Sequence, residues 1–215
     1  MYRKLKYYNT YIYLYQKAED DCLLHYQSKE KTKLSTFTKG VKAAINCNYF
    51  ASYNLGRSQG NKFNYIYDKD DILDCVIHNH KLYYGDFTKN DFPNSKCGFS
   101  PAAIFDFKKD HYLLSKAIVD KSKLLNNYKR HTYLIHTKET FYFLVHEPGL
   151  NSFDIKLFVK EFLKDPLIIV LLDGGGSSEM IVDGKIVTNN KVERPMFNAL
   201  VIVRDIHKKV PKGLF

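Results

Sequence analysis

The segment LLDGGGSSEM, residues 171–180, holds the residue types from which catalytic and anion-binding sites are built. Asp173 ends a run of aliphatic residues, three glycines follow it, and Ser177 and Ser178 come next. Glycine lets the backbone approach a ligand closely and adopt positive φ without steric cost, and successive amides of such a segment can bind an anion. A carboxylate at the end of a rigid strand is well placed for catalysis or for fixing a ligand.

A structural turn is the alternative for the same residues. The glycines could simply reverse the chain between the aliphatic run and the strand-like segment EMIVDGKIV. Most turns need one glycine or none, so three in succession favour a function. Asp183-Gly184, by contrast, is an ordinary hairpin-turn sequence to which we assign no chemistry.

The composition is that of a folded globular chain with excess positive charge. The chain has 215 residues, of which 45% are hydrophobic, and a formal net charge of +10. This charge favours anionic partners, although a solubilising coat of lysines would give the same excess. The lysines form no dense cluster within a recognisable nucleic-acid-binding module, which argues against nucleic acid as the partner.

The cysteines and the N-terminus bear on the compartment. No two cysteines form a CxxC pair, so zinc-ribbon and thioredoxin-like classes are unsupported. The N-terminus lacks the apolar region of a signal peptide, and no apolar run approaches the length of a membrane span. We therefore expect a soluble cytoplasmic protein with free thiols and no membrane partner.

Alternating apolar residues predict hairpins over most of the chain. A strand over 10–16 is expected to pair with one over 21–27, and a short strand runs into a loop within 39–50. Further hairpins are predicted over 71–85, 101–114 and 131–147, with turns at 78–80, 108–110 and 138–140. In the last hairpin, His136 and His146 are expected to be neighbours. We predict one α+β domain over residues 1–215, a largely antiparallel or mixed sheet of hairpins with few helices.

Two segments break the hairpin pattern. Residues 151–165 predict a helix capped by Asn151 or Ser152 and ended by Asp165-Pro166. Its apolar face is expected to contain Ile155, Phe158, Val159, Phe162 and Leu163. The aliphatic run LIIVLLD that follows is typical of a strand covered on both faces at the centre of a sheet.

Three segments resemble a known family. LLDGGGSSEMIVDGKIV followed by ERPMFNALVIV is similar to the signature of the phosphodiester glycosidase family. AAINCNYF resembles that family's Ala-Ile-Asn-Gly-Gly-Phe-Phe element, and RHTYLIHT resembles its Arg-Thr-Ala-Ile-Gly strand. The segments occur in the family order. The resemblance implies a phosphodiester-glycosidase-like fold and a hydrolase that cleaves a glycosidic bond to phosphate.

The resemblance also implies roles for individual residues. Breaking a sugar–phosphate bond gives an oxocarbenium-like sugar and a stable phosphate anion, so the site needs cations and donors aimed at phosphate. Arg194 suits this role because its planar fork grips two oxygens. Asp173 is the first candidate for the catalytic carboxylate and Glu193 the second. The candidate substrate-binding residues are Asn46, Asn48, Arg130, Gly174, Gly175, Gly176, Ser177, Ser178 and Asn198.

Several of these residues have structural alternatives. Glu193 and Arg194 could form ion pairs with each other or with neighbours, and Asn46, Asn48 and Asn198 could bond to backbone groups. The sequence also departs from the family pattern in the presumed pocket. Cys47 and Asn48 replace two glycines, Glu179 replaces a threonine, and either Arg130 or His131 takes the arginine position.

Two functions are compatible with these observations. The first is a hydrolase that cleaves a glycosidic bond to phosphate in a sugar phosphodiester or a nucleotide-derived small molecule. The second is a catalytically inactive protein that binds an anionic sugar phosphate or cyclic-nucleotide-type signal in the same pocket. A divalent cation, calcium or magnesium, is compatible with oxygens from Asp173 and phosphate, although no ligand spacing requires one. A Ser-His-Asp triad is unsupported, because no Gly-x-Ser-x-Gly elbow is present.

Overall fold

The computed structural model describes residues 1–36, 40–47, 58–59, 74–85, 87, 92, 97–114, 121–189 and 193–204. These residues form three sheets, and every strand pairing described in them is antiparallel. Helices are a small share of the structure. The antiparallel part of the predicted class is therefore confirmed, and mainly β describes the fold better than α+β.

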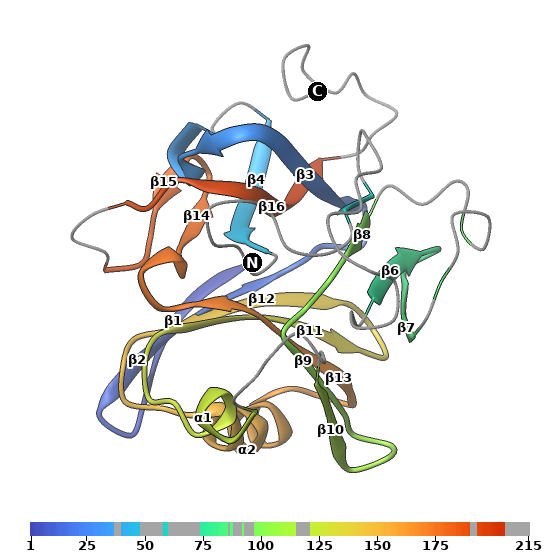
Figure 1. Cartoon of the computed structure of the whole chain (residues 1–215). Helices are drawn as coiled ribbons and strands as arrows, with labels where there is room; N and C mark the ends of the chain where they lie inside the picture. Colours follow the sequence, from blue (N-terminus) through green and yellow to red (C-terminus); the bar gives the residue numbers. More distant parts are fainter. Residues whose placement is uncertain are drawn as a thin grey trace.

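The largest sheet has seven strands, in the order β1-β2-β12-β11-β13-β9-β10. They are β1 (Tyr2–Tyr7), β2 (Thr10–Gln16), β9 (Ala103–Asp106), β10 (His111–Leu114), β11 (His131–Thr137), β12 (Phe141–His146) and β13 (Pro166–Gly174). Figure 1 shows helices α1 (Lys121–Leu125) and α2 (Ser152–Phe162) below this sheet. The predicted hairpins over 101–114 and 131–147 are confirmed, and β13 is an internal strand as expected.

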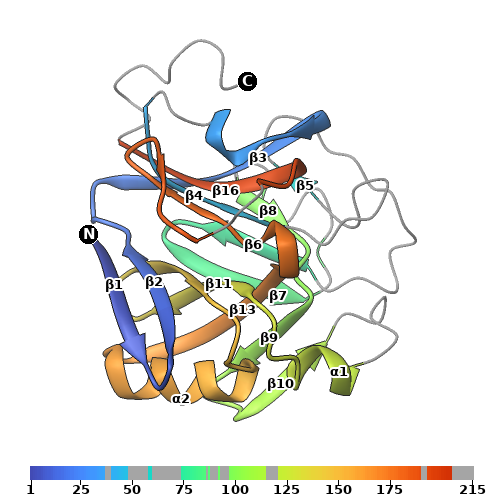
Figure 2. The same cartoon turned by 90° about the vertical axis from the view of Figure 1, so that its left-hand side faces the viewer.

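A five-stranded sheet lies over the opposite face of the seven-stranded sheet (Figures 1 and 2). Its order is β15-β14-β4-β16-β3, built from β3 (Asp21–Thr32), β4 (Val41–Asn46), β14 (Met180–Val182), β15 (Lys185–Ile186) and β16 (Met196–Arg204). A four-stranded sheet contains β5 (Ser58–Gln59), β6 (Asp74–His78), β7 (Lys81–Gly85) and β8 (Cys97–Phe99). The predicted turns at 78–80 and at Asp183-Gly184 are confirmed, with positive φ at Asn79, His80, Asp183 and Gly184.

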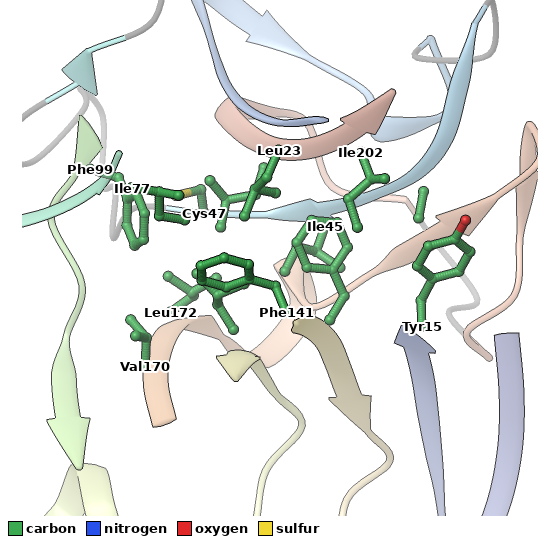
Figure 3. Close-up of a cluster of buried hydrophobic side chains, with 14 of the residues drawn as sticks. Tyr15, Leu23, Ile45, Cys47, Ile77, Phe99, Phe141, Val170, Leu172 and Ile202 are labelled. Atoms are coloured by element: carbon green, nitrogen blue, oxygen red, sulfur yellow. The ribbon is translucent and has the colours of Figure 1, made fainter. Parts of the chain in front are cut away.

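Apolar side chains fill the space on each side of the seven-stranded sheet. Figure 3 shows Ile45 and Ile202 of the upper sheet facing Phe141 and Leu172 of the lower one. On the other face, Phe158 and its neighbours on α2 pack against β2, β11, β12 and β13. The seven-stranded sheet is thus covered on both faces, which explains why β13 is aliphatic at every position from Leu167 to Leu172.

Helix α2 begins with a complete capping box. The Asn151 side-chain oxygen accepts from the amides of Phe153 and Asp154 at 2.9 and 3.0 Å, and the Asp154 carboxylate accepts from the Asn151 amide at 2.9 Å. The predicted apolar face is buried except for Phe162, which is 48% exposed. Phe162 lies at the rim, where its ring contacts Phe158 and Tyr7.

The predicted hairpin between residues 10–16 and 21–27 is wrong. β2 pairs with β1 and β12 in the seven-stranded sheet, whereas β3 pairs with β16 in the five-stranded sheet. Tyr15 and Leu23 belong to the same core between the sheets, so the two strands contribute to it from different layers. Alternation of apolar and polar residues identifies a strand without identifying its partner. The short connection over residues 17–20 favoured a hairpin, but the chain passes there from one sheet to the other.

The predicted proximity of His136 and His146 is also wrong. The register of β11 and β12 pairs His131 with His146, and His136 stacks on Phe141 instead. His136 lies five residues along β11 from His131, the residue that pairs with His146. No helix among the residues described here is long and apolar enough to cross a membrane.

Replacing Asn151 by alanine should reduce the free energy of unfolding by about 1 kcal/mol, because two amides at the start of α2 lose their acceptor. Urea denaturation checks the change. Asn151→Asp keeps an acceptor at the same position and should cost less; equal losses in the two variants would contradict the capping role.

Candidate active site

The predicted functional segment is where the chain passes from one large sheet to the other. β13 ends at Gly174 in the seven-stranded sheet, a 3-10 turn follows over Gly175–Ser177, and β14 begins at Met180 in the five-stranded sheet. Figure 1 shows this turn linking the two layers. We call residues 173–178 the sheet crossing. The glycines therefore do serve a change of layer, as the structural alternative requires.

The end of β4 holds both backbone polar groups of Asp173. The Asp173 amide donates to the Cys47 carbonyl at 2.9 Å, and the Asn46 side-chain amide donates to the Asp173 carbonyl at 2.8 Å. The Asn46 side-chain oxygen in turn accepts from the Thr132 hydroxyl at 2.6 Å. Asn46 is fully buried. The structure places it beside Asp173, with its amide bonded to the protein in the way that the structural alternative describes.

The Asp173 carboxyl lies under the sheet crossing with 7% of the residue exposed. It accepts from the Ser177 hydroxyl and from the Gly174 amide. Burial raises its pKa from 3.8 to about 6, and these two donors and the positive charge of Arg194 offset only part of that increase. A carboxyl that titrates in this range can exchange a proton near neutral pH, as a general acid or base must.

Ser177 links this carboxyl to the backbone of the glycines. Its buried hydroxyl oxygen lies within hydrogen-bonding distance of the Asp173 carboxyl and 3.0 Å from the Gly174 carbonyl. A hydroxyl has one proton to donate. It donates to the ionised carboxylate, or it accepts from the protonated carboxyl and donates to Gly174. Either protonation state of Asp173 therefore has a partner. Ser178 is also buried, with its hydroxyl 3.5 Å from the Asp173 carbonyl.

At two of the three glycine positions, the structure explains why glycine is required. A Cβ atom at Gly174 would lie 2.5 Å from Nδ1 of His131, so only glycine fits there. Burial lowers the pKa of His131 to about 4, which leaves this ring neutral at pH 7. Gly175 has φ +73°, a conformation that favours glycine, and its amide donates to the Arg130 carbonyl at 2.7 Å. The Gly175 amide is thus used within the fold.

Gly176 and Arg194 face each other at the surface of the crossing. Nη1 of Arg194 lies 3.7 Å from the position of a Cβ atom at Gly176. Both residues are exposed. Arg194 also lies near enough to Asp173 to favour the ionised carboxylate. The structure thus brings the predicted residues Asn46, Gly174, Gly176, Ser177 and Arg194 together around Asp173, and it combines a buried carboxyl with an exposed guanidinium.

Other predicted residues make contacts away from the carboxyl. Both Glu193 carboxylate oxygens accept from Ser35, and Arg130 forms an ion pair with Glu147 and donates to the Asn189 carbonyl. Nothing in the sequence pattern indicated Ser35 or Glu147 as partners.

Asn198 and Asn48 complete the set of predicted side chains. Asn198 is buried on β16, on the same strand face as Leu200 and Ile202. Asn48 lies outside the described residues.

No group of three or more His, Cys, Asp or Glu side chains in the described part of the chain is arranged to hold a metal ion. The Asp173 carboxyl already accepts from Ser177 and Gly174. Calcium and magnesium take six or more oxygen ligands. The described residues around Asp173 therefore do not by themselves supply a complete cation site.

The fold is similar to that of known proteins, whereas the sequence is not. No protein-family model and no curated protein sequence matches this chain. The structure resembles the catalytic domain of zebrafish N-acetylglucosamine-1-phosphodiester alpha-N-acetylglucosaminidase, auto-inhibited by its pro-peptide, with a TM-score of 0.68 and 13% identity over 94% of this chain and 81% of that one. It also resembles a hypothetical protein from Synechocystis, with a TM-score of 0.63 and 10% identity over 94% of this chain and 61% of that one. These likenesses establish the fold.

Alanine at Gly174 should destabilise the protein much more than alanine at Gly175. At Gly174 the new methyl group meets the His131 ring, whereas at Gly175 it points into open space and adds only a positive-φ strain of about 1 kcal/mol. Thermal unfolding of the two variants checks the order. His131→Ala should restore part of the stability lost in Gly174→Ala; a double variant no more stable than Gly174→Ala would contradict this steric explanation.

Asp173→Asn should stabilise the fold at neutral pH. The pKa of Asp173 is higher in the folded state than the unfolded value of 3.8, so ionising this buried carboxyl reduces stability as pH rises from about 4 to above 6. Each pKa unit corresponds to about 1.4 kcal/mol, so the gain at pH 7 should be of the order of 3 kcal/mol.

Urea denaturation of wild type and Asp173→Asn at pH 4, 5, 6 and 7 measures this effect. The difference between the two proteins should grow with pH. Asp183→Asn, in the exposed β14–β15 turn, is the matched control. A constant difference across this range would show that the Asp173 carboxyl is not the titrating group.

Proposed function

We propose that this protein is a hydrolase that cleaves a glycosidic bond to phosphate, in a sugar phosphodiester or a nucleotide-derived small molecule. One observation carries the proposal. The sheet crossing holds a buried carboxyl, Asp173, whose pKa is raised to about 6, next to an exposed guanidinium, that of Arg194. The fold similarity to a phosphodiester glycosidase catalytic domain supports this reaction class.

Arg194 is the proposed phosphate ligand. It is exposed beside Gly176, so an anionic group can reach its guanidinium from solvent. A planar guanidinium can donate to two phosphate oxygens at once, and its charge stabilises the negative charge that grows on the leaving phosphate. Gly176 lies under this guanidinium, where a Cβ atom would be in ordinary van der Waals contact with it.

Asp173 is the proposed catalytic carboxylate. The bond between the anomeric carbon and the phosphate oxygen breaks, and the phosphate leaves with the electron pair. Water adds to the carbon, and its proton passes to the ionised carboxylate of Asp173. Ser177 then accepts a hydrogen bond from the protonated carboxyl and donates to the Gly174 carbonyl, so the product state of the base also has a partner.

A catalytically inactive binding protein is the second candidate. Cys47, which stands where the family has glycine, is buried and its carbonyl is bonded to the Asp173 amide. Cys47 therefore has a structural role, and a cysteine in place of glycine changes the surroundings of the proposed catalytic carboxylate. Such a protein would hold the anionic ligand through Arg194 without turnover. A divalent cation bound with the substrate phosphate would add charge to either version of the site.

Hydrolysis is tested by incubating wild type, Asp173→Asn and Arg194→Met with sugar phosphodiesters, nucleotide sugars and cyclic nucleotides. Mass spectrometry detects any released sugar or monophosphate, with and without EDTA. We expect wild type to release product, Asp173→Asn to be inactive while still binding substrate, and Arg194→Met to show a raised KM and a lowered kcat. Asp183→Asn and Arg204→Met change exposed residues outside the crossing and should behave as wild type.

The outcomes separate the candidates. A compound that stays bound without turnover supports the binding protein, and a panel neither bound nor cleaved would overturn both. For the enzyme, kcat/KM should rise as pH increases through about 6 and then level off, because the base must be ionised. A rate that falls through this range would make Asp173 a general acid and contradict the proposed proton transfer.

A further inference from the structure

The carboxylate of Glu193 is bound at both oxygens by one residue. Oε1 accepts from the Ser35 amide at 2.6 Å, and Oε2 accepts from the Ser35 hydroxyl at 2.7 Å. Ser35 lies in the 3-10 turn η1 (Leu34–Thr36), which follows β3. Leu34 of that turn is fully buried in the core on the outer face of the five-stranded sheet. Glu193 is therefore tied to a fixed part of the fold.

The chain is also fixed on the other side of Arg194. Met196 is fully buried in the same core and pairs with Thr32 at the start of β16. Pro195 lies between Arg194 and Met196. A residue that precedes proline is restricted to extended conformations, and here that residue is Arg194. Arg194 thus stands between an anchored glutamate and a proline that leads into a buried strand.

We propose that Glu193 and Ser35 are positioning residues, which hold Arg194 over Gly176 so that its guanidinium is already placed to receive a phosphate. An arginine side chain loses much rotational freedom when it is immobilised on binding. Anchoring the chain on both sides of Arg194 fixes the main-chain position from which this side chain extends, so the backbone has little freedom left to lose on binding. This inference rests on the proposed phosphate-binding role of Arg194.

The same contacts give Glu193 a role different from that of a catalytic carboxylate. A second catalytic carboxylate would have to lie beside the reacting sugar, whereas both Glu193 oxygens are bonded to Ser35 and tie this side chain to the turn η1. The two roles predict different effects for Ser35→Ala. Loss of the hydroxyl leaves a catalytic Glu193 in place with its charge intact, but it weakens a positioning contact.

Inorganic phosphate is the probe for the positioning role. Isothermal titration calorimetry would compare wild type, Arg194→Ala, Ser35→Ala, Glu193→Gln and the double variant Ser35→Ala/Arg194→Ala. Loss of the cation should weaken phosphate binding by roughly tenfold or more, and loss of one anchoring bond by roughly threefold. In the Arg194→Ala background, Ser35→Ala should have no further effect, because the side chain that it positions is gone.

Thr36→Ala is the matched control, since it removes a hydroxyl from the same turn that bonds to Lys33 and not to Glu193. It should leave phosphate affinity unchanged. Wild-type affinity in both Ser35→Ala and Glu193→Gln would overturn the inference, and so would equal effects of Ser35→Ala in the presence and absence of Arg194.

A second measurement does not depend on phosphate binding. NMR relaxation of the arginine side-chain Nε–H groups would compare Arg194 with the exposed Arg204 in the protein without ligand. Arg194 should be the more ordered of the two and should become more mobile in Glu193→Gln. If Arg194 is ordered but wild type binds no phosphate, the proposed function fails and the anchoring stands. If Arg194 is as mobile as Arg204, the anchoring itself is refuted.

Discussion

The arrangement of the site depends on the hydrogen bonds from the end of β4 to the backbone of Asp173. The Cys47 carbonyl and the Asn46 side chain take the amide and the carbonyl of the same residue, and Asn46 also receives the Thr132 hydroxyl from β11. These bonds join the end of one large sheet to the end of the other at a single buried residue. Because such groups would otherwise be buried without partners, the bonds are costly to break. The carboxyl direction is therefore set by the packing of the two sheets.

This construction explains how a charged group is kept where burial disfavours it. The rigid backbone prevents Asp173 from turning towards solvent, so the carboxyl remains under the crossing and its pKa stays raised. Keeping this carboxyl in place reduces the stability of the fold at neutral pH. Ser177 limits that loss, since it offers the carboxyl a hydrogen-bonding partner in both protonation states.

Local patterns in the sequence were sufficient to predict elements whose contacts lie within a short stretch of chain. The hairpins over 101–114 and 131–147 have short turns between regular strands, and the cap and apolar stripe of α2 lie within residues 151–163. The pairing of β3 with β16 could not be predicted, because it joins segments from opposite ends of the chain and alternation carries no information about the partner.

The same limit applies to the site. Asp173 and the glycines form one segment, and their grouping was visible in the sequence. The sequence did not indicate where the side chains of Glu193 and Arg194 point, although these residues are adjacent. The partner of Glu193 is Ser35, which is 158 positions away in the chain. Likewise, the pairing of Arg130 with Glu147 depends on how β11 and β12 end in three dimensions.

The position of β16 has a consequence for the order in which the molecule can assemble. β16 lies between β4 and β3, so the five-stranded sheet cannot close before residue 204 is available, although β3 and β4 come early in the chain. Closing contacts between such distant segments is slow, and it leaves apolar strands exposed in the meantime. During synthesis on the ribosome, the hairpins of the seven-stranded sheet can form first. The sheet that contains β4 and holds the Asp173 backbone can form only after β16 has been synthesised, so the surroundings of this carboxyl are completed late in folding.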